Sequence, residues 1–160
     1  VIEPVRRPVD LAMVVDNVID RLEQQQPADI EVSVLPRILN VDPAKIERVV
    51  ENLVVNAIKH TPPGCHVWVS CQDVDDGVLL SVQDDGPGVP DEFKSLVFEP
   101  FERGDTASPA PGTGIGLSLV RRFVELHGGA AWVEDRDGGG SAFNVWLPDI
   151  DADPDPVDVV

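Results

Sequence analysis

The sequence ENLVVNAIKH, residues 51–60, has the spacing of an amphipathic helix but carries two asparagines, Asn52 and Asn56. Asparagine is a poor helix former because its side chain competes for backbone hydrogen bonds. At 100° per residue these two side chains and Lys59 lie on one face, whereas the apolar residues form a separate stripe. Neutral amide oxygens on adjacent turns can bind Mg²⁺, and a lysine one turn further on suits a phosphate. We therefore expect a functional face outside the core; the plainer alternative is a solvated face.

The segments around this helix predict an α+β domain. Helical periodicity predicts helices at residues 10–25, 43–60 and 114–127. Alternating apolar residues predict strands at residues 30–35, 65–71, 77–85, 130–136 and 141–148. Because strand pairs are adjacent in sequence, we expect a two-layer α/β sandwich: a mixed sheet of about five strands with about three helices on one face.

Composition limits the classes of function. The chain has 160 residues, a net charge of −17 and a pI near 4.2, so it would repel nucleic acid. No apolar run approaches the roughly 18 residues of a membrane span. Cys65 and Cys71 would lie about 20 Å apart on one strand, too far for a disulfide, and free thiols suit the cytoplasm. We expect a linker remnant at 1–9, one domain at 10–148 and an acidic disordered tail at 149–160.

Two glycine-rich segments accompany the asparagine face. DDGPGVP, residues 84–90, ends a predicted strand, where a carboxylate could accept a hydrogen bond from an exocyclic amine and glycines would let a flat ring approach. GTGIGL, residues 112–117, opens a predicted helix, and the free N–H groups of a helix start bind phosphate. Taken singly, ordinary turn chemistry and a flexible linker explain these segments equally well.

Together, and in this order, these segments resemble the GHKL ATP-binding superfamily, specifically the catalytic domain of bacterial sensor histidine kinases. NLVVNAIKH resembles the N box, and DDGPG, residues 84–88, resembles the G1 box. VFEPFERG, residues 97–104, resembles the F box, and GTGIGL resembles the G2 box. The resemblance covers about residues 10–148 and implies the binding of ATP with Mg²⁺.

The resemblance also implies roles for individual residues. Asn56 would bind Mg²⁺, Asp84 would hold the adenine amino group, and residues 98–113 would form a mobile lid over the nucleotide. Catalytic roles fall on Asn52, Lys59 and Arg103. The implied nucleotide-binding residues are Asn52, Asn56, Lys59, His60, Asp84, Gly86, Gly88, Phe98, Arg103, Gly112, Thr113, Gly114, Ile115, Gly116, Leu117 and Ser141.

The residue at position 52 favours phosphoryl transfer over hydrolysis. ATPases of the superfamily place a water-activating glutamate four residues before the metal asparagine, whereas this chain has Asn52 there, and an amide is not a general base. The resemblance implies that the acceptor is a histidine, which can attack phosphorus as a neutral imidazole. His60, His66 and His127 do not resemble the family's acceptor context, so we expect the acceptor on an upstream dimerisation segment of the same protein.

The resemblance implies a response regulator as a further partner. We expect a monomeric, cytoplasmic fragment without membrane contact, although its parent protein could be membrane-anchored. Two alternatives remain: a serine kinase of the anti-sigma-factor type, and a non-catalytic module that senses a nucleotide through lid movement.

Overall fold

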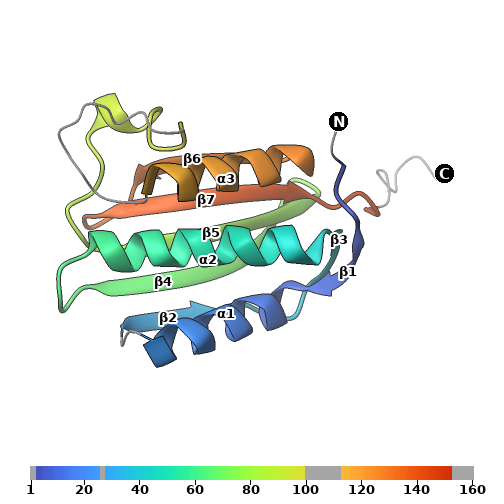
Figure 1. Cartoon of the computed structure of the whole chain (residues 1–160), viewed down its shortest axis with the longest axis horizontal. Coiled ribbons are helices and arrows are strands. Elements are labelled where there is room, and N and C mark those ends of the chain that lie inside the picture. The colour runs from blue at the N-terminus through green and yellow to red at the C-terminus, as the bar shows by residue number, and fades with distance from the viewer. Residues whose placement is uncertain (1–2, 26–27, 100–112, 153–160) are drawn as a thin grey trace.

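The computed structural model describes residues 3–25, 28–99 and 113–152, and Figure 1 shows their arrangement. The elements in chain order are β1 (Arg7–Asp10), α1 (Leu11–Gln25), β2 (Asp29–Ser33), β3 (Ile38–Val41), α2 (Pro43–His60), β4 (His66–Val74), β5 (Gly77–Asp84), the 3₁₀ helix η1 (Asp91–Phe93), α3 (Thr113–Leu126), β6 (Ala130–Asp135) and β7 (Ser141–Pro148). The three predicted helices and five predicted strands are all present.

A five-stranded sheet forms one layer, with the strand order β2-β4-β5-β7-β6. Strand β2 pairs in parallel with β4 and the other neighbours are antiparallel, so the sheet is mixed as expected. The β4–β5 turn follows its sequence: Asp75 and Asp76 have φ values of 50° and 59°, which a two-residue hairpin requires and which aspartate tolerates.

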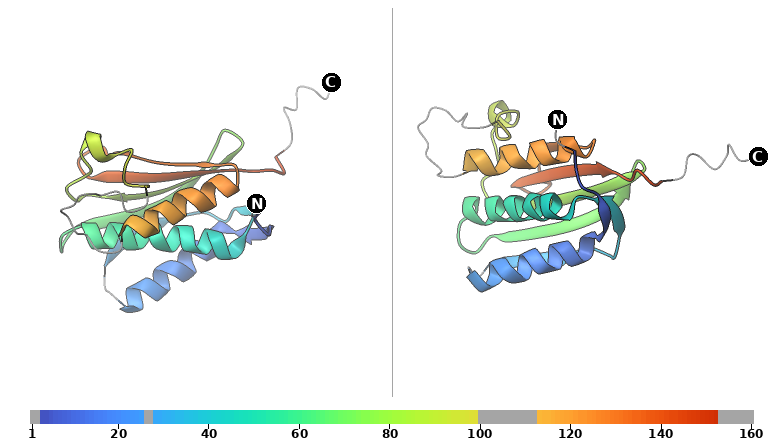
Figure 2. Two further views of the ribbon diagram at one scale, coloured as in Figure 1. Left: turned by 45° about the horizontal axis from the view of Figure 1, so that its top comes forward. Right: turned by 45° about the vertical axis from the view of Figure 1, so that its right-hand side comes forward.

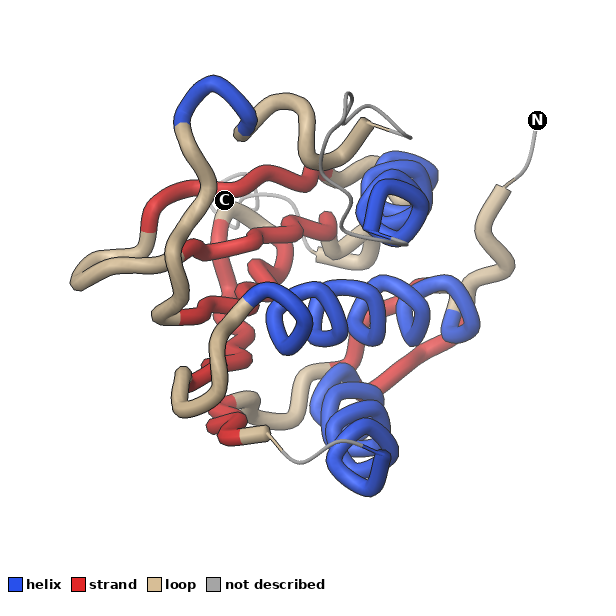
Figure 3. The backbone as a smooth tube through the Cα atoms, turned by 60° about the vertical axis from the view of Figure 1, so that its left-hand side comes forward, coloured by secondary structure: helices blue, strands red, loops and turns tan. Residues whose placement is uncertain are grey.

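The three helices form the second layer, on one face of this sheet, as Figures 2 and 3 show. Helix α2 lies between the other two in Figure 1. Asp42 caps α2 by accepting a hydrogen bond from the Lys45 backbone N–H, and Pro43 occupies the first turn. The apolar stripe of α2 is buried in the core at Ile46, Val50, Leu53 and Ala57.

A separate two-stranded sheet, β1 with β3, was not predicted. Arg7 pairs with Val41, so residues 7–9 of the expected linker form part of a strand. The Arg6 side chain also donates a hydrogen bond to the Asn40 carbonyl oxygen. Four-residue strands carry little periodicity, and a proline within β1 argues against a strand on sequence grounds.

Asp149, the first residue of the expected acidic tail, contacts the folded domain. Asp149 forms an ion pair with Arg37 at 3.1 Å, and its backbone N–H donates to the Asp76 carbonyl oxygen. The tail prediction for residues 153–160 lies outside the described residues. Cys65 and Cys71 are free thiols, as predicted.

Gly128 and Gly129 follow α3, and the geometry at the end of this helix requires both glycines. Gly128 has a φ of +82°, and the Gly129 N–H donates back to the Val124 carbonyl oxygen, which closes the helix. A Cβ atom on Gly129 would lie 2.0 Å from the Trp146 carbonyl oxygen. The pair therefore both ends α3 and brings the chain against β7.

Candidate functional site

Asn56 is a buried polar side chain on α2. It is 8% exposed, so the expectation that this face lies outside the core was wrong for Asn56. The helical period gives the direction of a side chain, but not which neighbouring element covers it. No hydrogen bond joins the Asn56 amide to another residue in the described part of the chain, and a buried amide without a partner is unfavourable. Such an amide is suited to a bound ligand.

The other polar residues of this face differ in exposure. Lys59 and His60, in the last turn of α2, are exposed. Asn52 is half-buried, and its Nδ2 donates a hydrogen bond to the Gly116 carbonyl oxygen of α3 at 3.1 Å. The predicted face thus contacts α3 at Asn52 and exposes the cationic side chain of Lys59 at the end of α2.

Asp84 is a buried carboxylate at the end of β5. The residue is 5% exposed, and its Oδ1 accepts a hydrogen bond from the Gly86 backbone N–H at 3.0 Å. Burial raises the pKa of Asp84, while backbone N–H groups of Gly86 and Ser141 act in the opposite direction. Ser141 is also buried and pairs with Asp84 across the β5–β7 ladder. The site therefore offers a shielded hydrogen-bond acceptor.

The glycines around Asp84 are explained by close contacts or by a positive φ. A Cβ atom on Gly86 would lie 3.0 Å from the Thr61 side chain, and Gly88 has a φ of +82°. Gly140 was not predicted: its φ is +101°, and a Cβ atom there would lie 1.8 Å from the Asp84 carbonyl oxygen. The run of three glycines before β7 was the available signal for this residue.

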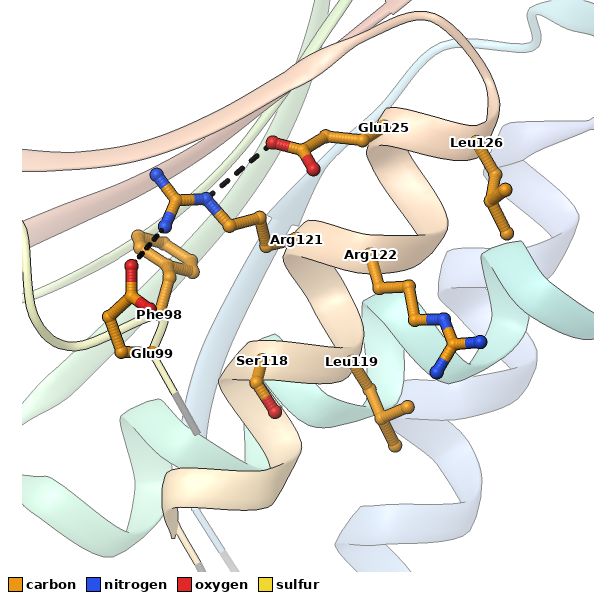
Figure 4. Close-up of a pocket in the computed structure, with 8 residues that line it drawn as sticks. All are labelled: Phe98, Glu99, Ser118, Leu119, Arg121, Arg122, Glu125 and Leu126. Carbon is orange, nitrogen blue, oxygen red and sulfur yellow. Dashed lines mark hydrogen bonds and ion pairs between the residues drawn. The ribbon is translucent and has the colours of Figure 1, made fainter. Parts of the chain in front are cut away.

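Phe98 and Leu117, both predicted at the nucleotide site, are core residues. Phe98 is buried with its ring edge toward Phe143, at 6.2 Å between centroids. Phe98 also lines an open groove along α3, shown in Figure 4, in which Arg121 forms an ion pair with Glu99 at 2.9 Å. Of the predicted site residues that the structure describes, only Phe98 lines this groove.

The histidines occupy three different environments. His127 is 2% exposed; its Nδ1 donates to the Phe123 carbonyl oxygen at 2.8 Å, and its Nε2 accepts the Asp42 N–H at 3.0 Å. Burial lowers the pKa of His127, so the ring is neutral and structural. The His66 Nδ1 atom lies 2.9 Å from Asp29 Oδ2, where β4 pairs with β2. His60 is exposed at the end of α2.

Some predicted site residues cannot be placed. Arg103 and Gly112 lie outside the described residues. Thr113, Gly114 and Ile115 form the first turn of α3, of which only the backbone is described. Within the described ranges, no helix is long and apolar enough to cross a membrane, and no group of three or more acidic, histidine or cysteine side chains could hold a metal ion.

Known proteins resemble this chain in both sequence and fold. The signal transduction histidine-protein kinase/phosphatase MprB of Mycolicibacterium paratuberculosis (strain ATCC BAA-968 / K-10) is 40% identical over 150 residues, covering 90% of this chain but only 29% of the relative. A solved structure named mycobacterial sensor histidine kinase MprB superposes with a TM-score of 0.79 at 36% identity, covering 89% of this chain and 97% of that one.

A second solved structure, histidine kinase ThkA in complex with the response regulator protein TrrA, gives a TM-score of 0.74 at 26% identity, covering 90% of this chain and 42% of that one. The family model described as "Histidine kinase-, DNA gyrase B-, and HSP90-like ATPase" matches residues 41–151. The chain therefore belongs to the family of histidine kinase-, DNA gyrase B- and HSP90-like ATPases.

Proposed function

We propose that this domain binds ATP with Mg²⁺ and transfers the γ-phosphoryl group to a histidine on a segment that precedes it in the parent protein. The observation that carries the proposal is Asn56, a buried amide without a partner among the described residues. Its neutral oxygen is a suitable ligand for Mg²⁺, which prefers a few protein oxygens together with phosphate. A bound Mg²⁺ would neutralise charge on the phosphates.

Asp84 supports a purine at the other end of the site. Its buried carboxylate would accept a hydrogen bond from the adenine amino group, with Ser141 beside it. Gly86 and Gly88 would leave room for the ring, because neither carries a side chain. A guanine carries a carbonyl at the equivalent position and would meet the carboxylate with repulsion, so the pocket would select adenine.

The phosphates would lie between the end of α2 and the start of α3. Lys59 is exposed at the end of α2, and with His60 it would contact the phosphates or the ribose. The α3 backbone from Thr113 would contribute its free N–H groups, and Gly112 and Arg103 would act from the lid. These residues would orient the triphosphate and exclude water.

Transfer is favoured over hydrolysis because no base is available at position 52. The Asn52 amide cannot take a proton from water, and its nitrogen already donates to Gly116. Water near the γ-phosphoryl group would therefore remain a weak nucleophile. This arrangement preserves ATP for a better acceptor.

The acceptor is proposed to lie outside this chain. His127 cannot attack phosphorus, because it is buried and both ring nitrogens are engaged. The chain spans 29% of the MprB relative, which leaves room for an acceptor segment in a longer parent. By analogy with ThkA and its response regulator, we propose that the phosphoryl group passes on to a response regulator, and that this domain is monomeric and cytoplasmic.

The test is a transfer assay between separate pieces. This chain is incubated with γ-labelled ATP, Mg²⁺ and the separately purified segment that precedes it in its parent. Acid-labile label is expected on that segment, and not with the Asn56→Ala variant. Label that is acid-stable on a partner would favour the serine kinase, and binding of ATP without transfer by the full-length parent would favour the sensing module.

A further inference from the structure

Asn52 and Asn56 lie on one face of α2 but differ in their hydrogen bonding. The Asn52 Nδ2 atom is 3.1 Å from the Gly116 carbonyl oxygen, which is a hydrogen-bond acceptor only. The orientation of this amide is therefore fixed, with the nitrogen toward α3. Asn56, one turn further along α2, has no such partner among the described residues.

The contact at Gly116 joins the two helices close to the start of α3. Gly116 is the fourth residue of α3, and a Cβ atom there would lie 3.7 Å from the Asn52 Cγ atom, an ordinary van der Waals contact. The close approach therefore does not depend on the missing side chain of Gly116. The hydrogen bond from Asn52 is a directional contact between this turn and α2.

We propose that Asn52 is a positioning residue that fixes the first turns of α3 relative to Asn56, and that it does not bind Mg²⁺. The inference rests on the proposed function, since it assigns separate roles to the two asparagines of the same nucleotide site. Asn56 holds the ion, and Asn52 holds the helix whose start faces the phosphates.

The same contact makes position 52 unsuitable for a carboxylate. An aspartate or glutamate there carries only acceptor oxygens, one of which would face the Gly116 carbonyl oxygen. Introducing the water-activating glutamate of related ATPases would therefore remove the hydrogen bond between α2 and α3. Asparagine at this position keeps this hydrogen bond and provides no base.

The experiment measures the Kd for ATP by calorimetry in Mg²⁺ and in EDTA, for the wild type, Asn52→Ala, Asn52→Asp and Asn56→Ala. The ratio of the two Kd values reports the magnesium-dependent part of binding. For Asn52→Ala we expect both Kd values to rise by about tenfold with an unchanged ratio, as for the loss of one hydrogen bond. For Asn56→Ala we expect the ratio to fall toward one.

Asn52→Asp distinguishes the two possible roles of Asn52, hydrogen-bond donor and Mg²⁺ ligand, because an aspartate carboxylate cannot donate a hydrogen bond but binds Mg²⁺ well. We expect it to bind weakly in both conditions. Wild-type affinity of Asn52→Asp in Mg²⁺, a ratio that collapses in Asn52→Ala, or unchanged Kd values in Asn52→Ala would each overturn the inference. Thermal unfolding without nucleotide confirms that each variant is folded, and a wild type that binds no ATP would instead contradict the proposed function.

Discussion

At the scale of single residues, the site is built from polar groups that are unfavourable for the fold alone. Asn56 is buried without a partner among the described residues, and Asp84 is a carboxylate whose pKa is raised by burial. Both features lower the stability of the free domain, and the proposed nucleotide would explain both. Replacing either side chain should therefore weaken ATP binding without lowering the stability of the domain.

For Asn56→Ala, the unfolding temperature should stay the same or rise, because the buried amide has no hydrogen bond to another described residue that could be lost. Magnesium-dependent ATP binding should be lost. Leu53→Ala is the matched control on the same helix: Leu53 is fully buried, so its truncation should cost about 2 to 5 kcal/mol of unfolding free energy. Thermal and urea unfolding measure both. A loss of several kcal/mol in Asn56→Ala would show that the amide is structural.

For Asp84→Asn, ATP affinity should fall by about 10- to 100-fold, as expected for the loss of a hydrogen bond to a charged group. The pKa of Asp84 in the folded domain is raised above its ordinary value of 3.8. The contribution of Asp84 to the unfolding free energy is therefore fully present below pH 3.8 and is lost as the pH rises through the folded pKa. At pH 7 the variant should therefore be at least as stable as the wild type. Urea unfolding at pH 4 and pH 7 measures this; a variant that is less stable at pH 7 than at pH 4, relative to wild type, would contradict it.

At the scale of elements, α2 and α3 are joined at both ends of their contact. Asn52 donates to Gly116 near the start of α3, and Asp42 donates its N–H to His127 just after the end of α3. Asp42 Oδ2 also accepts the Val5 N–H at 2.9 Å, so the incoming chain meets both helices at one residue. Asp42 therefore connects the incoming chain to the start of α2 and to the residue that follows α3.

We expect this junction to be sensitive to pH, because His127 is buried within it. Its folded pKa is lowered by burial, so the stability that depends on neutral His127 is present above its ordinary value of 6.5 and is lost as the pH falls below it. Arg6 and Lys45 oppose protonation, and Asp42 favours it. Protonation would remove the acceptor for the Asp42 N–H.

We expect the wild type to lose unfolding free energy between pH 7.5 and pH 5.5, and His127→Gln to lose less. Glutamine can both donate and accept but does not titrate. Urea denaturation at the two pH values measures the difference. Equal pH dependence in both proteins would contradict this role of His127.

The elements themselves could be predicted from local sequence, and the exceptions were set by tertiary packing. The Asp42–Pro43 cap and the Asp75–Asp76 turn appear in the structure because short-range rules determine them. Strands β1 and β3 are stabilised only by each other and by the surrounding domain, so no local pattern indicates them. The burial of Asn56 and the role of Gly140 likewise depend on which segments meet.

At the scale of the whole molecule, the two-layer fold brings three distant segments together. Helix α2 supplies the amide face, the β5 end supplies Asp84, and the start of α3 approaches α2 at Asn52 (Figure 1). The sequence motifs predicted this set of segments. They could not predict that Asn56 is buried while Asn52 contacts Gly116, because one helical stripe gives both residues the same direction.

The measurement that tests the central claim most directly is calorimetric titration of ATP with Mg²⁺ into the folded chain. We expect one nucleotide to bind per chain, with binding weakened by EDTA and with no comparable binding of GTP. Absence of binding at millimolar ATP, in a sample that unfolds cooperatively, would contradict the account. Equal affinity for ATP and GTP would contradict the adenine role of Asp84.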